Sequence, residues 1–257
     1  MVDLHLSLKM TELVGLAAGV TLAWMRLSRP AAMLLFFAAS ASSFTEVAKS
    51  FIAHWPYVPM YQGINQIEAL LAFSLFLLSI SPRYYKGQSF IFTGLTACVL
   101  SLASLLFPKD YYLPNINTGS LWAHVFSWSN SMGRAALIWG AAGAAEAWSR
   151  RKAAANNQAT PWFMWPAIAL SIAFTSLALL SGAVWSLSTI GAPVSFHDPS
   201  AIGLLLVWVY LLLISHIRPS GWKRDIRLGI IALGGVIAVA VTLYSDMGVW
   251  KAPWGRP

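Results

Sequence analysis

The chain has 257 residues, of which 58% are hydrophobic and only 10% are Asp, Glu, Lys or Arg. Soluble domains carry roughly 25% charged residues, so this composition excludes a water-covered surface and favours a protein whose solvent is lipid. The formal net charge of +8 does not indicate nucleic-acid binding, because the basic residues stand in short loops between apolar runs. A single cysteine, Cys98, excludes a disulfide or a paired-cysteine redox site within the chain.

The apolar runs are long enough to cross a membrane as helices, since a bilayer core of about 30 Å needs about 20 apolar residues. The sequence therefore predicts an all-α fold, a polytopic transmembrane helix bundle with about eight spans. We expect residues 1–257 to form one integral membrane domain. In chain order, the expected spans are roughly 11–27, 30–53, 63–81, 89–107, 120–148, 162–188, 201–217 and 227–245.

Basic residues fall in every second loop between these runs. Loops rich in Lys and Arg stay in the cytoplasm, so both termini are expected to face outward. The loops 54–62, 108–119 and 189–200 are expected on the same outward side of a cell inner (cytoplasmic) membrane or its organelle equivalent. The basic residues are Arg26 and Arg29, then Arg83 and Lys86, then Arg150, Arg151 and Lys152, then Arg218, Lys223, Arg224 and Arg227.

Several ionisable residues lie inside the expected spans, where an unpaired charge costs several kcal/mol. Glu46 and Lys49 are three residues apart on one helix, so we expect them to form an ion pair. Glu68 and Arg134 are expected to pair between two helices, which is also a structural role.

Histidines near the expected outward surface, among them His124 and His197, lie close to aromatic residues. Neutral imidazole is a common ligand of haem iron, and haem needs a flat apolar pocket. Two simpler interpretations stay open: the aromatic residues can form an interfacial belt, and His124 can be a hydrogen-bonded core histidine. His216, at the cytoplasmic end of its span, can likewise be an interfacial residue.

Sequence motifs of hydrolases, metalloproteases, nucleotide-binding loops and covalent haem attachment do not occur in the chain. The chain is therefore expected to have no catalytic motif of its own. His197 with Asp198 offers too few ligands for a structural zinc site.

Several short segments, in order, match one known family. "GAVWS" (182–186), "DP" (198–199), "WVYLLLISHIR" (208–218) and "GW" (221–222) resemble the end of the cytochrome c assembly family, the CcsA/CcmC-type haem-handling membrane proteins. "LWAHVFSWSNSMGRAAL" resembles the helix that carries their first external haem-ligand histidine, and "NQIE" resembles their N-x-x-E. The likeness covers roughly 54–249. This chain departs from the family in its outward loop, "IGAPVSFHDP", which lacks the family's tryptophans, and in a last helix without an outer histidine.

The resemblance implies a protein of cytochrome c biogenesis that holds or exports non-covalent, b-type haem at the outer membrane face for attachment to apocytochrome c. It implies His124 and His216 as iron ligands, with His197 and Met247 as candidates for a second outward ligand. Asp198 belongs to the loop that frames the haem shelf. It also implies two partners besides apocytochrome c: a second assembly membrane protein with a soluble outward domain, and a thiol-reducing protein. The aromatic shelf would comprise Trp122, Trp128, Trp185 and Phe196.

A second interpretation comes from another class of protein. Histidines near both membrane faces are also typical of an integral subunit of a respiratory-type complex, either a b-type haem electron carrier working with quinol or a haem-free scaffold. Such carriers pair histidines at similar depth, and His216 has no partner histidine on the expected cytoplasmic side.

Overall fold

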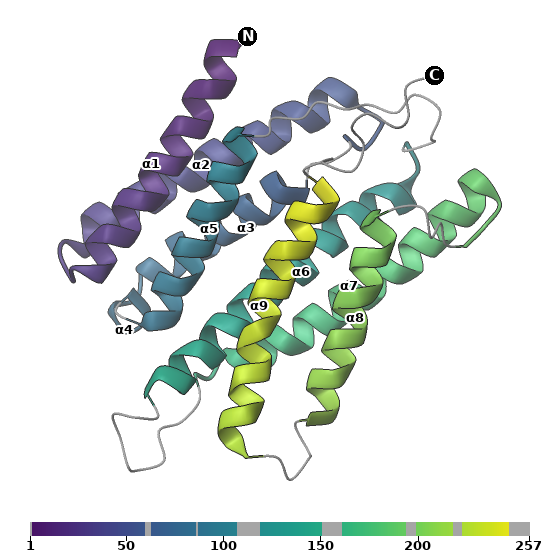
Figure 1. Cartoon of the computed structure of the whole chain (residues 1–257). Coiled ribbons are helices and arrows are strands. Elements are labelled where there is room, and N and C mark those ends of the chain that lie inside the picture. Colours follow the sequence, from purple (N-terminus) through teal and green to yellow (C-terminus); the bar gives the residue numbers. More distant parts are fainter. Residues whose placement is uncertain are drawn as a thin grey trace.

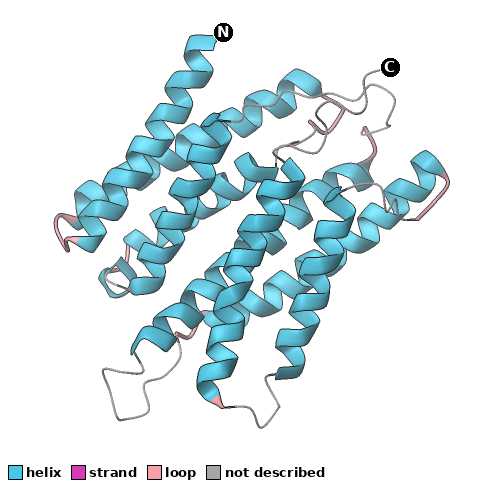
Figure 2. Ribbon diagram, viewed as in Figure 1, coloured by secondary structure: helices cyan, strands magenta, loops and turns pink. Residues whose placement is uncertain are grey.

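The computed structural model describes residues 2–59, 63–85, 87–106, 119–150, 161–193, 199–217 and 223–246. All regular secondary structure in these ranges is helical (Figures 1 and 2). The helices are α1 (Val2–Trp24), α2 (Arg29–His54), α3 (Gly63–Ser79), the short α4 (Pro82–Tyr85), α5 (Gln88–Leu106), α6 (Leu121–Arg150), α7 (Met164–Ile190), α8 (Pro199–Ile217) and α9 (Arg224–Asp246).

The expected all-α bundle is confirmed, and by length and composition five of its helices, α1, α2, α5, α7 and α9, can cross a membrane. Two further apolar helices, α3 and α8, are shorter. The 30-residue α6 is long enough but carries serines, a histidine and an arginine along its first half. The chain is therefore a helical, multi-pass membrane protein.

The helix that contains the first expected span is longer than that span. The expected span begins near residue 11, whereas α1 begins at Val2. The polar side chains at positions 5, 9 and 12 do not end the helix, because Lys9 and Glu12 are buried against α2 and α3 rather than exposed to lipid.

The helices form two halves that α6 joins (Figure 1). In the N-terminal half α1 packs on α2 and α5, and α3 packs on α2 and α5. In the C-terminal half α6 packs along α7 and α9, while α8 packs on α9 and less extensively on α7. Because α6 contacts α3 and α5 more extensively than α9 does, it is the main helix through which one half meets the other.

One end of the bundle gathers the basic residues of the turns, and we call it the basic end. The Arg29 guanidinium donates to the Ile80 carbonyl at 3.1 Å, which ties the α1–α2 turn to the end of α3. At the same end Glu146 of α6 accepts a hydrogen bond from the Ser89 N–H at 2.8 Å, so it caps the start of α5. The basic residues at this end are Arg26, Arg29, Arg150, Arg224 and Arg227.

Small residues let α6 and α7 pack closely. The Ser171 hydroxyl on α7 donates to the Gly133 carbonyl on α6 at 2.7 Å. A Cβ atom at Gly133 would lie 2.6 Å from Thr175 Oγ1, so only glycine permits this approach. Close helix packing over small residues is typical of membrane proteins, where dispersion contacts replace the hydrophobic effect between helices.

The outer surface carries the two features of a lipid-facing bundle. Large apolar side chains are exposed along the middle of helices, as at Leu34 on α2, Leu180 on α7 and Val236 on α9. Exposed tryptophans lie toward both ends, Trp24 at the basic end and Trp55 at the opposite one. Tryptophan at both ends of a bundle is typical of the two membrane–water interfaces.

Candidate functional site

Polar residues follow one face of α6 from its start to its middle. His124, Ser127, Ser131 and Arg134 are spaced by three, four and three residues, which places them on one side of the helix over about 15 Å. Ser131 donates to Gln66 Oε1 of α3 at 2.6 Å, and the Gln66 amide donates to Ser127 at 3.0 Å. This stripe is therefore the polar seam between the two halves.

The expected pair of Arg134 with Glu68 is wrong. Arg134 is buried, and its Nη1 donates to two hydroxyls of α9, Thr242 at 3.2 Å and Ser245 at 3.1 Å. Because α9 runs antiparallel along α6, the end of α9 meets the middle of α6, where the stripe ends, and the arginine contacts α9.

His124 lies among aromatic rings at the end opposite the basic end, which we call the His124 end. Its ring centre is 5.6 Å from that of Trp55 and 6.1 Å from that of Phe51, and Phe51 is 5.7 Å from Trp128. Its Nε2 is 2.8 Å from the Pro56 carbonyl oxygen. A carbonyl only accepts, so Nε2 carries the hydrogen and a neutral ring leaves Nδ1 for a ligand.

Trp185 lies on a different side of α6. It stacks on Phe126, with ring centres 5.9 Å apart and planes at 28°. Phe126 in turn packs over Gly182, where a Cβ atom would lie 2.8 Å from the ring. Positions 124 and 126 point about 200° apart on a helix. The structure thus brings Trp128 near His124 through Phe51, whereas Trp185 belongs to a second aromatic contact.

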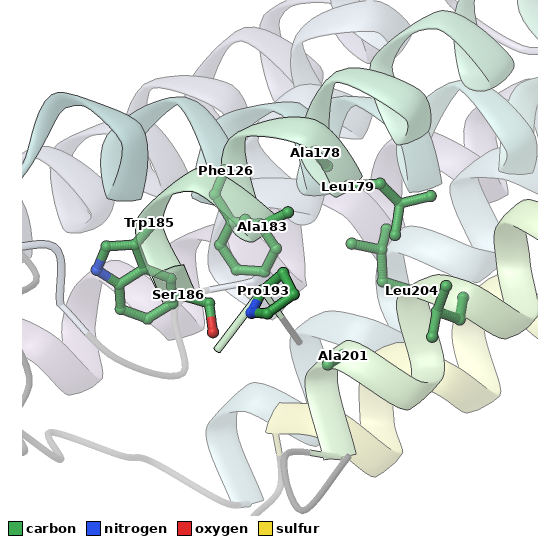
Figure 3. A pocket seen from close by; sticks show the side chains of 11 residues that line it. Phe126, Ala178, Leu179, Ala183, Trp185, Ser186, Pro193, Ala201 and Leu204 are labelled. Carbon is green, nitrogen blue, oxygen red and sulfur yellow. The ribbon is translucent and has the colours of Figure 1, made fainter. Parts of the chain in front are cut away.

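An apolar pocket opens beside Trp185 between α6, α7 and the start of α8 (Figure 3). The space between its walls is about 480 Å³, which includes space open to the surroundings, and the walls include Phe126, Leu179, Pro193 and Leu204. Ser186 is the one hydroxyl among the described lining residues, and it already donates to the Ala192 carbonyl at 2.7 Å. The pocket fits an apolar group and offers no described side chain that ligates iron.

The other predicted site residues do not gather around His124 in the described part of the chain. Trp122 is exposed at the start of α6. His216 is exposed near the end of α8, and its Nδ1 donates to the Leu212 carbonyl at 2.7 Å, which leaves Nε2. The start of α8 lines the pocket at the His124 end, so His216 lies roughly 25 Å away along that helix and cannot share a ligand with His124. Phe196, His197, Asp198 and Met247 lie outside the described residues.

The described residues fit one axial position of a haem. His124 supplies a ring nitrogen, and Phe51, Trp55 and Trp128 supply an apolar wall. In the described part of the chain, no group of three or more His, Cys, Asp or Glu side chains is arranged so that it could hold a metal ion.

A cluster of ion pairs inside the N-terminal half is the site that the sequence analysis missed. The Lys9 ammonium lies 2.7 Å from Glu68 Oε2, 3.0 Å from Glu46 Oε2 and 3.2 Å from Glu12 Oε2. His5 Nδ1 lies 2.9 Å from the other Glu46 oxygen. We call these five residues the Lys9 cluster. Residues 5, 9 and 12 are spaced by four and three residues, which places them on one face of α1. This spacing is the sequence signal that could have predicted a polar face turned toward the interior.

The expected pair of Glu46 with Lys49 is therefore wrong. Lys49 is exposed on α2, whereas Glu46 turns inward to Lys9 and His5 of the neighbouring helix. A buried carboxylate gains more from a partner that is also buried than from one that snorkels toward water.

Two places at the His124 end can thus bind a ligand chemically: the imidazole of His124 and the carboxylates of the Lys9 cluster. The hydroxyls of Ser127 and Ser131 are hydrogen-bonded to the side-chain amide of Gln66. An amide is not a general base, so it does not activate these serines as nucleophiles. No protein-family model, curated protein or solved structure matches this chain.

Proposed function

We propose that this protein handles haem in a membrane during cytochrome c assembly, with His124 as an iron ligand at the outer face. The observation that carries the proposal is the setting of His124: a partly buried imidazole between the rings of Phe51 and Trp55, with one nitrogen bonded to the Pro56 carbonyl and the other left for a metal.

The basic end supports an orientation in which His124 faces outward. Basic residues of the turns gather at that end, and such residues stay on the cytoplasmic side. We therefore propose about eight spans in the inner membrane or its organelle equivalent, with both termini outward, α6 included among the spans. His124 then lies near the outer headgroups and His216 near the cytoplasmic ones.

Each residue of the site has a stated role in the proposal. Bound haem supplies the iron and the vinyl groups to which apocytochrome thiols attach. Pro56 orients the imidazole through its carbonyl, while Phe51 and Trp128 exclude water from that face. His197 and Met247 remain candidates for a second ligand. Since Cys98 is the one thiol in the chain and lies within α5, thiol reduction belongs to a partner, alongside apocytochrome c and an assembly protein with a soluble outward domain.

The test is the optical spectrum of the purified full chain from haem-replete cells. We expect a b-type spectrum that is lost in His124→Ala and kept in the matched control His54→Ala, since His54 lies at the same end and its Nδ1 is bonded to Ser50. Colourless protein, together with normal cytochrome c maturation in a deletion strain, would overturn the proposal. Reduction of bound haem by a quinol analogue would instead identify an electron carrier.

A further inference from the structure

The Lys9 cluster holds more acid than base. Three carboxylates, those of Glu12, Glu46 and Glu68, surround one ammonium, so full ionisation leaves two uncompensated negative charges. The side chains of Lys9, Glu12 and Glu68 are at most 1% exposed. An unpaired charge in such a place is expelled by taking up a proton, because burying it costs far more than neutralising it.

The place of that proton follows from two neighbouring carboxyl groups. Oε2 of Glu12 and Oε2 of Glu68 lie 3.2 Å and 2.7 Å from the same Lys9 nitrogen, and Oε1 of each has no described donor. Two carboxylates that are this close and this deeply buried cannot both stay ionised, so the two groups share one proton.

A proton suits this site better than a metal ion does. The Lys9 ammonium already stands where the oxygens converge, since it binds Asn65 Oδ1 at 3.0 Å as well as the three carboxylates. A bound cation would have to displace an ammonium that is tied to helix α1. A shared hydrogen needs no such displacement.

The cluster also has a route to water. Glu46 Oε2 lies 3.0 Å from the Lys9 ammonium and Glu46 Oε1 lies 2.9 Å from His5 Nδ1, so Glu46 stands between the buried centre and an imidazole that is 43% exposed. Imidazole exchanges protons readily near neutral pH. Among the other groups of the packed helices, Lys49 is exposed on α2, Ser104 of α5 donates to Asn65, and the Cys98 thiol of α5 is half-buried.

From these observations we propose that the Lys9 cluster is a proton-binding site. One exchangeable proton is held between Glu12 and Glu68 and reaches the aqueous phase at the His124 end through Glu46 and His5. The proposal gives the "NQIE" segment a role, because Asn65 and Glu68 both bind Lys9. It needs no haem and stands apart from the function proposed above.

The test is infrared spectroscopy of the full chain in lipid at neutral pH. We expect the C=O stretch of a buried carboxylic acid, shifted in D2O and lost in both Glu12→Gln and Glu68→Gln. Glu146→Gln is the matched control, because Glu146 is also buried but already accepts from Ser89 and pairs with Arg150. A wild-type spectrum without this band, or a band that survives both substitutions, overturns the proposal.

Two further measurements use protein that keeps the buried centre intact. In His5→Ala we expect D2O exchange of the band to slow by about a hundredfold, the lower limit of what a positioned proton-transfer group contributes. An unchanged exchange rate overturns the route through His5. Sodium or potassium chloride, added in turn to the wild type, should leave the band in place, and its loss in one of these salts would identify a cation site instead.

Discussion

The two halves of the bundle hold their helices together by different means. In the N-terminal half, Lys9 of α1 ties α2 and α3 together through charge. In the C-terminal half, α6 and α7 meet over glycine and serine, with backbone and hydroxyl groups in contact. The first half should therefore be sensitive to the loss of a charge and the second to an added methyl group, and substitutions of each kind test this difference.

The largest expected effect is in the charged half. Lys9→Met removes the cation that three buried carboxylates share, and we expect it to lower the free energy of unfolding by about 3–5 kcal/mol. The loss should shrink at low pH, because protonation neutralises the abandoned carboxylates. Unfolding of the detergent-solubilised protein measures it. Lys49→Met, at an exposed position of α2, should change stability by less than about 0.5 kcal/mol. Equal losses in both variants would contradict a charge-dependent N-terminal half.

A smaller effect is expected where the C-terminal half is closely packed. Gly133→Ala places a Cβ atom 2.6 Å from Thr175 Oγ1 and 3.2 Å from its backbone nitrogen, so α6 and α7 must separate. We expect a loss of about 1–3 kcal/mol, typical of overpacking. Gly229→Ala, where nothing lies within 4 Å of the added atom, should be neutral or stabilising. A destabilised Gly229→Ala with an unaffected Gly133→Ala would show that helix propensity, not packing, governs this half.

The seam between the halves should respond to polarity. Gln66 is fully buried and bonds Ser127 and Ser131 of α6, so Gln66→Leu leaves two hydroxyls without their amide partner. We expect a loss of about 1–2 kcal/mol, because a buried hydroxyl deprived of its partner keeps its desolvation cost. The triple variant Gln66→Leu, Ser127→Ala, Ser131→Ala should recover most of it, and a further loss there would argue that the serines act independently of Gln66.

The sequence specified the fold better than it specified the site, and particular residues show why. The boundaries of α3 and α8 were predicted to within two residues, because their apolar runs end at polar or proline-containing turns. The first turns of α1 lie outside the expected span because hydropathy penalises Lys9 whether or not the fold supplies its partner. That partner, Glu68, is 59 residues away from Lys9 in the sequence. The expected ion pair instead joined Glu46 to Lys49, which is three residues away on the same helix. His124 does lie beside aromatic rings, as its neighbours in the sequence suggested, but its contacts with Phe51 and Pro56 depend on how α2 ends beside α6.

The smallest predicted effect concerns the contact between "GAVWS" and α6. Gly182→Ala places a methyl group 2.8 Å from the Phe126 ring. The ring is the movable end of a side chain, so we expect it to tilt off Trp185 at a cost of about 1 kcal/mol or less.

Tryptophan fluorescence can follow this movement. We expect the spectrum of Gly182→Ala to change through the stacked Trp185, and we expect no further change when Gly182→Ala is added to Phe126→Leu, which has already removed the stacking partner. If the fluorescence change persists in the Phe126→Leu background, the glycine has another role than making room for that ring. Added side-chain volume would then destabilise the C-terminal half only near Gly133, and not at the His124 end where the pocket opens.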